Sequence, residues 1–260
     1  MNLIQTAFEC EAPVALVTGS GAPRVGRAIA VDLARAGCRI AIHANTSDDD
    51  AHKLAAELNE RFKTESIVTL GAIEQDSVAE DLVDQTVQAF GRLDVLVNSA
   101  AIWKPTKLER VTAAEIRHYF DVNAIGTFLC ARAAGEIMST QASGGSIVNL
   151  GDWATVRPYM DHAAYFPSKG AIPTLTRNMA VELADRNPAI RVNCVAPGWI
   201  KTAWGEDADQ RWQQRAVDES LWGRWGVPED VARAAVFLDS PPAAFINGQL
   251  VEVNGGFRRT

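Results

Sequence analysis

A glycine-rich loop near the start of the chain constrains the fold more than any other feature of the sequence. Residues 14–18 (VALVT) form an apolar segment of strand type, and the loop from Gly19 to Gly26 (GSGAPRVG) follows it directly. The next segment, RAIAVDLARAG, has helical spacing of its apolar residues and ends at Gly37. This order of strand, loop and helix predicts a dinucleotide site, because glycines let the backbone approach a pyrophosphate and a helix N-terminus supplies N–H donors.

The rest of the chain alternates between short apolar segments and longer helical ones. Further strands are expected in the final segment QLVEVNGG and at residues 39–43, 66–70, 95–98, 146–150 and 191–195. The alternation predicts an α/β chain, a single-domain Rossmann fold with a doubly wound seven-stranded parallel sheet (order 3-2-1-4-5-6-7) and helices on both faces. Residues 1–260 are expected to form this one domain, with residues 199–226 as a substrate-loop region.

Composition and charge narrow the classes of partner. The net charge is −7 and the chain has no long Lys/Arg run, so we expect a small-molecule substrate rather than a nucleic acid or an anionic membrane. The four cysteines are far apart and form no CxxC motif, which predicts neither a metal site nor a disulfide framework. The first residues, MNLIQTAFECEAP, lack a basic segment followed by an apolar one, and no apolar run is long enough for a membrane span, so we expect a cytoplasmic protein without such a span.

A second motif, within residues 151–169, carries groups that can handle protons. Tyr165 and Lys169 are four residues apart, so a helix from Ala164 onward would put the phenol and the ammonium on one face, one turn apart. A nearby cation stabilises phenolate, and the Tyr165 hydroxyl would then be a better acid toward an atom that has just received a hydride. Asp152 precedes this pair and completes the set. An ordinary surface Tyr and Lys is the alternative for the YxxxK spacing alone.

The residues after the second predicted strand bear on the choice of dinucleotide. Enzymes that use NAD usually place an acid there, about 20 residues past the glycine loop, to hold the ribose hydroxyls. This chain instead has Asn45, Thr46 and Ser47, and Arg24 lies in the loop. Amide and hydroxyl groups without a carboxylate favour NADP(H) over NAD(H), although Asp48 is close enough to leave NAD(H) as the alternative.

Six segments together resemble the short-chain dehydrogenase/reductase family across essentially the whole chain: TGSGAPRVG, NSAA, DVNAIGTF, YFPSK, RVNCVAPGWIKT and GQLVEVNGG. The resemblance implies a homotetramer with Tyr165 as proton donor and Lys169 as the residue that binds the nicotinamide ribose. It implies that Asn123 holds a water linking Lys169 to solvent. Asp152 stands where the family normally has a serine that orients the substrate. The cofactor-binding residues implied are Gly19, Arg24, Val25, Asn45, Thr46, Ser47, Asn98, Ala100, Tyr165, Lys169, Pro197, Gly198, Ile200 and Thr202.

Within that family the chain looks most similar to pteridine reductases. They too carry Asp at the serine position and Arg in the glycine loop, and they have an aromatic residue five positions after the first Asn of the strand-four motif, which here is Trp103. The resemblance implies that Trp103 stacks on a pterin and that Arg24 lies between the pterin and the cofactor phosphates. The expected substrate contacts are Arg24, Trp103, Asp152, Trp153 and Trp199. The longer glycine loop is also similar to enoyl reductases, but the YxxxK spacing disagrees with them.

Three functions follow from these observations. The favoured one is an NADPH-dependent oxidoreductase that reduces a C=N bond of a pterin or dihydropterin, in which Asp152 and Tyr165 relay a proton to the ring nitrogen and Lys169 keeps the pKa of Tyr165 low. A closed pocket walled by tryptophans would raise the pKa of Asp152 by desolvation. The alternatives are a generic carbonyl reductase, acting on a 3-oxoacyl-carrier-protein, a sugar or another ketone, and a catalytically silent dinucleotide sensor. The tryptophans at 199, 204, 212, 222 and 225 either line the site or pack the core or an oligomer contact.

Overall fold

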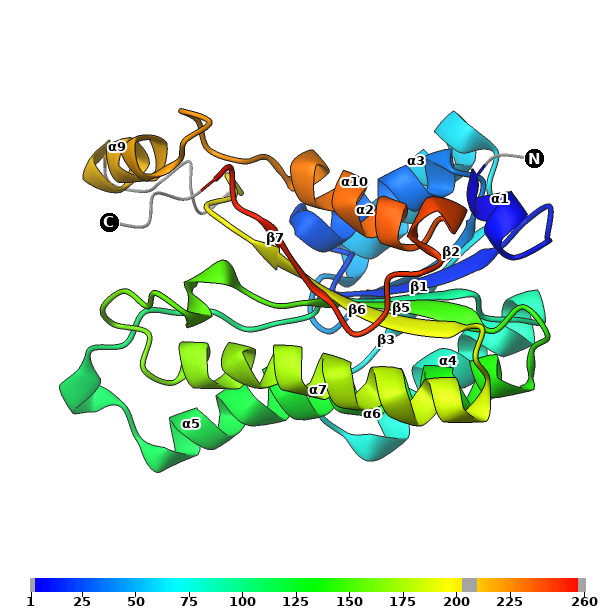
Figure 1. Ribbon diagram of the computed structural model, residues 1–260, viewed down its shortest axis with the longest axis horizontal. Helices are drawn as coiled ribbons and strands as arrows, with labels where there is room; N and C mark the ends of the chain where they lie inside the picture. Colours follow the sequence, from blue (N-terminus) through cyan, green and yellow to red (C-terminus); the bar gives the residue numbers. More distant parts are fainter. Residues whose placement is uncertain (1–2, 203–209, 257–260) are drawn as a thin grey trace.

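Seven parallel strands form one sheet in the order β3-β2-β1-β4-β5-β6-β7, as the sequence predicts (Figure 1). The computed structural model describes residues 3–202 and 210–256. Side chains of β1, β4 and β5 are buried along their full length, which is expected where helices cover both faces of a parallel sheet. The strands are β1 (Val14–Thr18), β2 (Arg39–Ala44), β3 (Ser66–Leu70), β4 (Val95–Asn98), β5 (Gly145–Leu150), β6 (Ile190–Pro197) and β7 (Leu250–Val253).

Helices cover the sheet on both sides. One face carries α1 (Leu3–Ala7), α2 (Val25–Arg35), α3 (Asp48–Phe62) and α10 (Pro228–Leu238). The other carries α4 (Asp76–Phe90), α5 (Ala113–Phe120), α6 (Gly126–Thr140) and α7 (Tyr165–Arg186), and α9 (Gln210–Glu219) lies beyond the sheet at the left of Figure 1. Three short 3-10 turns are η1 (Leu108–Arg110), η3 (Trp153–Thr155) and η4 (Pro241–Ala243). This arrangement leaves the carboxyl ends of the strands and the loops that follow them to form a site.

The long helix expected around Asn123 is interrupted. Thr112 caps α5, since its Oγ1 accepts a hydrogen bond of 3.1 Å from the Glu115 amide. The π-helical segment η2 (Asp121–Ile125) then separates α5 from α6. Such segments are rare and occur often at functional sites. Asn123 lies in this segment and is fully buried.

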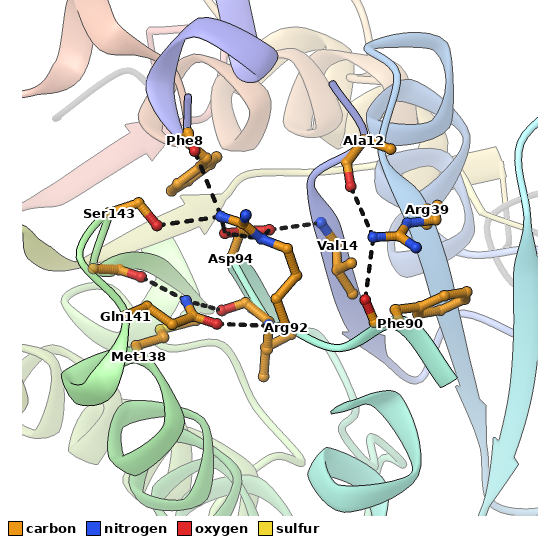
Figure 2. A network of polar contacts seen from close by, with 12 residues as sticks. Phe8, Ala12, Val14, Arg39, Phe90, Arg92, Asp94, Met138, Gln141 and Ser143 are labelled. Atoms are coloured by element: carbon orange, nitrogen blue, oxygen red, sulfur yellow. Dashed lines mark hydrogen bonds and ion pairs between the residues drawn. The ribbon is translucent and has the colours of Figure 1, made fainter. Parts of the chain in front are cut away.

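The amino ends of β1, β4 and β5 are held by a buried polar network (Figure 2). Asp94 Oδ2 accepts hydrogen bonds from the Val14 amide (2.9 Å) and from Arg92 Nε (2.8 Å). Arg92 also donates to Ser143 Oγ (3.2 Å), and Gln141 pairs with both backbone groups of the residue between Arg92 and Asp94. Because Arg92 and Asp94 pair with each other, the network joins the strands at the edge opposite the glycine loop without an unpaired Asp94 charge in the interior.

Asp239 contrasts with that network. It follows α10, is fully buried, and its carboxyl oxygens make no hydrogen bond of normal geometry within the described residues, although the Ser146 hydroxyl and Arg191 are close enough to favour its charged form somewhat. Burial outweighs both neighbours and raises the pKa of Asp239 to about 7. An ionised Asp239 is therefore a cost to the folded state at neutral and alkaline pH.

We predict that Asp239→Asn makes stability less dependent on pH. The folded-state pKa lies above the unfolded one, so the stability that the neutral carboxyl provides is present at low pH and is lost as pH rises through about 7. Between pH 5 and 8 the difference in free energy of unfolding between variant and parent should shift by about 2–3 kcal/mol in favour of the variant. Urea unfolding at the two pH values measures this shift.

Asp230→Asn is the matched control for that experiment. Asp230 lies in the first turn of α10, the helix that Asp239 follows, and hydrogen bonds from Arg224 lower its pKa. Its carboxyl is already ionised at pH 5 in both states, so the variant should differ from the parent by the same amount at both pH values. A constant difference for Asp239→Asn as well would show that its carboxyl does not titrate in this range.

Candidate active site

Asp152 and Tyr165 meet directly at the carboxyl end of β5. Asp152 precedes the short turn η3, where its Oδ1 accepts a hydrogen bond of 2.8 Å from the Ala154 amide. Its Oδ2 accepts a hydrogen bond of 2.8 Å from the hydroxyl of Tyr165, which is the first residue of α7. Two residues 13 positions apart in the sequence therefore form one acid pair.

Burial governs the protonation of this pair. Desolvation raises the pKa of Asp152, and the Ala154 amide, the Tyr165 hydroxyl and the Lys169 charge oppose that rise in decreasing order. The direction agrees with the sequence prediction. Trp153, which is 6% exposed, forms part of the surrounding wall. The carboxyl consequently keeps its proton to a higher pH than an exposed aspartic acid does.

Lys169 acts on the pair less directly than predicted. Its Nζ donates a hydrogen bond of 2.7 Å to the Leu150 carbonyl oxygen, and burial lowers its pKa. The expectation that Lys169 keeps the pKa of Tyr165 low is wrong here. The pKa of Tyr165 lies well above its ordinary value, first because the phenol is buried and then because the Asp152 carboxylate is its neighbour. The sequence reasoning left both the burial of the phenol and the neighbouring carboxylate out of this balance.

Asn123 connects the π-helical segment to two other parts of the site. Its Oδ1 accepts from the Ile102 amide (2.9 Å), and its Nδ2 donates to the Ile102 carbonyl (3.2 Å) and to Ser168 Oγ (3.0 Å). These bonds fasten the segment that carries Trp103 to α7. The sequence analysis did not identify Ser168, although its place beside Lys169 in YFPSK was a signal. The predicted role of Asn123 in holding a water stays a prediction.

An aromatic cluster packs beside the acid pair. Trp103 stacks on His162, with ring centroids 4.8 Å apart, and Tyr159 stacks on Trp199 at 5.2 Å. Both pairs belong with Tyr165 to a cluster of aromatic and apolar side chains at the carboxyl end of the sheet. The sequence analysis singled out Trp103 and Trp199 but missed Tyr159 and His162. Their signal was the aromatic residues in PYMDHAAYF, directly before Tyr165.

The glycine loop packs closely against the protein itself. Gly19 has a φ of +66°, and a Cβ there would lie 2.7 Å from Ala100 Cα, while a Cβ on Gly26 would lie 2.8 Å from the Gly19 carbonyl oxygen. Only glycine is tolerated at such approaches. Arg24 precedes α2 without a side-chain hydrogen bond to the helix terminus, which leaves amides of the first turn of α2 to bind an anion.

The other predicted cofactor residues follow the carboxyl ends of neighbouring strands, as the topology requires. Asn45, Thr46 and Ser47 follow β2, and the first two are exposed. The side-chain Nδ2 of Asn98 donates a hydrogen bond of 2.9 Å to Asn149 Oδ1. Trp204 lies outside the described residues. The remaining predicted residues sit in the loop and start of α2, after β4, or at and beyond the end of β6: Val25, Ala100, Pro197, Gly198, Ile200 and Thr202.

The described residues contain no group of three or more His, Cys, Asp or Glu side chains that could hold a metal ion. No described helix is both long enough and apolar enough to cross a membrane.

Comparisons with known proteins cover nearly the whole chain. A family model described as "Enoyl-(Acyl carrier protein) reductase" matches residues 22–258. The chain is 33% identical over 246 residues to the (2S)-[(R)-hydroxy(phenyl)methyl]succinyl-CoA dehydrogenase subunit BbsD of Thauera aromatica, with 94% of this chain and 95% of that protein covered. It is 34% identical over 261 residues to a versicolorin reductase of Emericella nidulans, with 96% and 97% covered.

A solved structure is also similar. The structure of a 7 alpha-hydroxysteroid dehydrogenase complexed with NADH and 7-oxo glycochenodeoxycholic acid matches with a TM-score of 0.88 and 28% identity, over 95% of each chain.

We predict that Tyr165→Phe raises the pKa of Asp152 further, because the phenol hydroxyl stabilises the carboxylate through its hydrogen bond. Infrared difference spectroscopy across a pH titration measures the loss of the protonated carboxyl band. The background should carry Asp239→Asn, since Asp239 is a second buried carboxyl that titrates late. Asp152→Asn assigns the band, and an Asp152 band unaffected by Tyr165→Phe would contradict the pairing.

Proposed function

Because the chain belongs to the short-chain dehydrogenase/reductase family, we propose that it is an NADPH-dependent oxidoreductase that reduces a C=N bond of a pterin or dihydropterin. The observation that carries the proposal is the partly buried hydrogen bond of 2.8 Å between Asp152 and Tyr165. Reduction of C=N needs a proton at nitrogen. A carboxyl joined to the phenol provides a second acid where the family normally has a serine.

The cofactor assignment is NADP(H). The family binds a nicotinamide dinucleotide, and the first turn of α2, where Arg24 makes no capping hydrogen bond, is the proposed site for its pyrophosphate. When bound, the reduced nicotinamide supplies a hydride. Exposed Arg24, Asn45 and Thr46 offer a cation and hydrogen-bonding groups to a 2′-phosphate, and residues 45–47 include no carboxylate to repel it. NAD(H) is the alternative, since the similar hydroxysteroid dehydrogenase was solved with NADH.

In the proposed reaction the two acids of the pair act in sequence. Hydride addition to the ring carbon leaves an electron pair on the ring nitrogen, and the Tyr165 hydroxyl gives this nitrogen its proton. Protonated Asp152 returns a proton to the Tyr165 oxygen through their shared hydrogen bond. The balance is C=N, one hydride and one proton giving CH–NH. Lys169, which is 4% exposed, is proposed to bind the nicotinamide ribose. Asn123 is proposed to hold the residues around Lys169 in place through its hydrogen bond to Ser168.

Aromatic side chains support a planar substrate. Trp103 and Trp199 are the proposed stacking residues, together with Tyr159, which the sequence analysis missed. An offset aromatic stack contributes about 1 kcal/mol beyond the area it buries. Trp153 and Arg24 complete the proposed substrate contacts. Residues 199–226 remain assigned as the substrate-loop region, supported by the packing of Trp199 against Trp212 and Trp225.

A carbonyl reductase is the second candidate. The similarity to a versicolorin reductase and to a hydroxysteroid dehydrogenase complexed with a 7-oxo compound favours it. In that case Asp152 would be a polar contact to substrate, and Tyr165 alone would protonate the oxygen of a reduced ketone.

The location and assembly are proposals as well. A cytoplasmic location is supported by the four free cysteines. A homotetramer is supported by large apolar side chains that are about two-fifths exposed along α5, the π-helical segment and α6: Ile116, Ile125 and Phe128.

We predict that the protein oxidises NADPH with dihydrobiopterin or folate, and does so faster than with NADH. Asp152→Ser, which restores the residue usual in the family, should lower kcat for the pterin roughly 100-fold while the affinity for NADPH changes little, because only the proton relay is lost. The measurement is NADPH consumption by parent and variant.

An acetoacetyl thioester is the comparison substrate for that assay. Turnover of the thioester but not of any pterin would establish the carbonyl reductase. A parental pterin rate in Asp152→Ser would show that Asp152 does not relay the proton.

A further inference from the structure

His43 lies near the end of β2 and is 1% exposed, yet both ring nitrogens are hydrogen-bonded. Nδ1 accepts from the Gly19 amide at 3.0 Å, and Nε2 lies 2.9 Å from the Gly71 carbonyl oxygen. The amide can only donate and the carbonyl can only accept, so the ring carries its proton on Nε2. Burial lowers the pKa of His43, which keeps this neutral form.

The backbone of His43 holds the same loop. Its carbonyl oxygen accepts from the Ser20 amide at 3.0 Å and lies 3.3 Å from the Gly21 amide. His43 thus accepts hydrogen bonds from the backbone amides of three consecutive loop residues, one at its ring and two at its carbonyl oxygen. Those amides are not available to cofactor phosphates. The amides that remain for a pyrophosphate lie further along, in the first turn of α2.

The glycine loop is closely packed against its neighbours, so a small displacement of the loop would produce steric clashes. Gly19 adopts a φ of +66°, and a Cβ there would already lie 2.7 Å from the Ala100 backbone. On the far side of the ring, Gly71 adopts a φ of +150°, and a Cβ there would lie 2.5 Å from a Val78 methyl group. The imidazole therefore spans from the loop after β1 to the turn after β3, and a shift of the ring displaces one of two closely packed segments.

We propose that His43 is a positioning residue for dinucleotide binding, which acts by holding the glycine loop through Gly19 rather than by touching the cofactor. The hydrogen bond to Gly19 fixes the position of the loop, and the hydrogen bond to Gly71 fixes the orientation of the imidazole ring. The proposal rests on dinucleotide binding by this family and is independent of the substrate, so it is tested by binding alone.

Three substitutions separate the two contacts. His43→Asn places an amide oxygen where Nδ1 accepts from Gly19, whereas His43→Gln extends an amide toward Gly71 and leaves the Gly19 amide without its acceptor. His43→Phe removes both contacts. We expect the Kd for NADPH to rise roughly tenfold in His43→Phe and His43→Gln and to stay within about twofold of the parent in His43→Asn. Titration of protein tryptophan fluorescence with NADPH, and with NADH in parallel, measures these constants.

Thr69→Val is the matched control. Thr69 lies directly opposite His43 in the β2–β3 register, is 1% exposed, and its hydroxyl donates to the Ile42 carbonyl oxygen at 3.4 Å rather than to the glycine loop. This variant should melt at a lower temperature than the parent and bind NADPH equally well.

Two results would overturn the role of His43. One is equal affinity in His43→Gln and the parent, and the other is a loss of affinity in Thr69→Val as large as that in His43→Phe. Absence of binding by the parent to either nucleotide would instead contradict the cofactor assignment, and that outcome is separate from the role of His43.

Discussion

The site depends on one hydrogen bond, between Oδ2 of Asp152 and the hydroxyl of Tyr165. It crosses from the loop after β5 to the first turn of α7, and it brings two acids together at a largely buried position. Burial raises the pKa of the carboxyl, and the carboxylate raises the pKa of the phenol. While Asp152 is protonated, the carboxyl and the phenol can both donate a proton, and the proposed relay to a substrate nitrogen requires this state. The Lys169 ammonium, held on the Leu150 carbonyl, limits how far the carboxyl pKa rises.

The two edges of the sheet are stabilised differently. At the amino edge, Arg92 and Asp94 satisfy each other and fix the strand ends, so this edge needs no ligand to complete it. At the carboxyl edge, amides of the first turn of α2 and the polar residues after β2 are left to bind a cofactor. His43 links that open edge internally by joining the glycine loop to the turn after β3. The sheet thus positions loops whose hydrogen-bonding groups are only partly paired within the protein.

The fold could be predicted from the sequence because its signals are local or periodic. The apolar segments became the seven strands, and the glycine loop lies where strand meets helix. The parts that escaped prediction depend on contacts between distant segments. The π-helical turn at Asn123 has no pattern of its own, and the two bonds of the His43 ring exist only once β1 and β3 flank β2. The pKa of Tyr165 was expected to fall because Lys169 was weighed as its neighbour, whereas the structure makes Asp152 the closer partner.

The pH dependence of hydride transfer in a single turnover tests the paired acid most directly. NADPH oxidation on the enzyme would be followed with a dihydropterin in the parent and in Asp152→Ser. The account predicts that the parent rate is highest where Asp152 is protonated and falls as pH rises through its raised pKa, and that the variant reacts slowly without this step. Equal rates and the same pH profile in both proteins would contradict it.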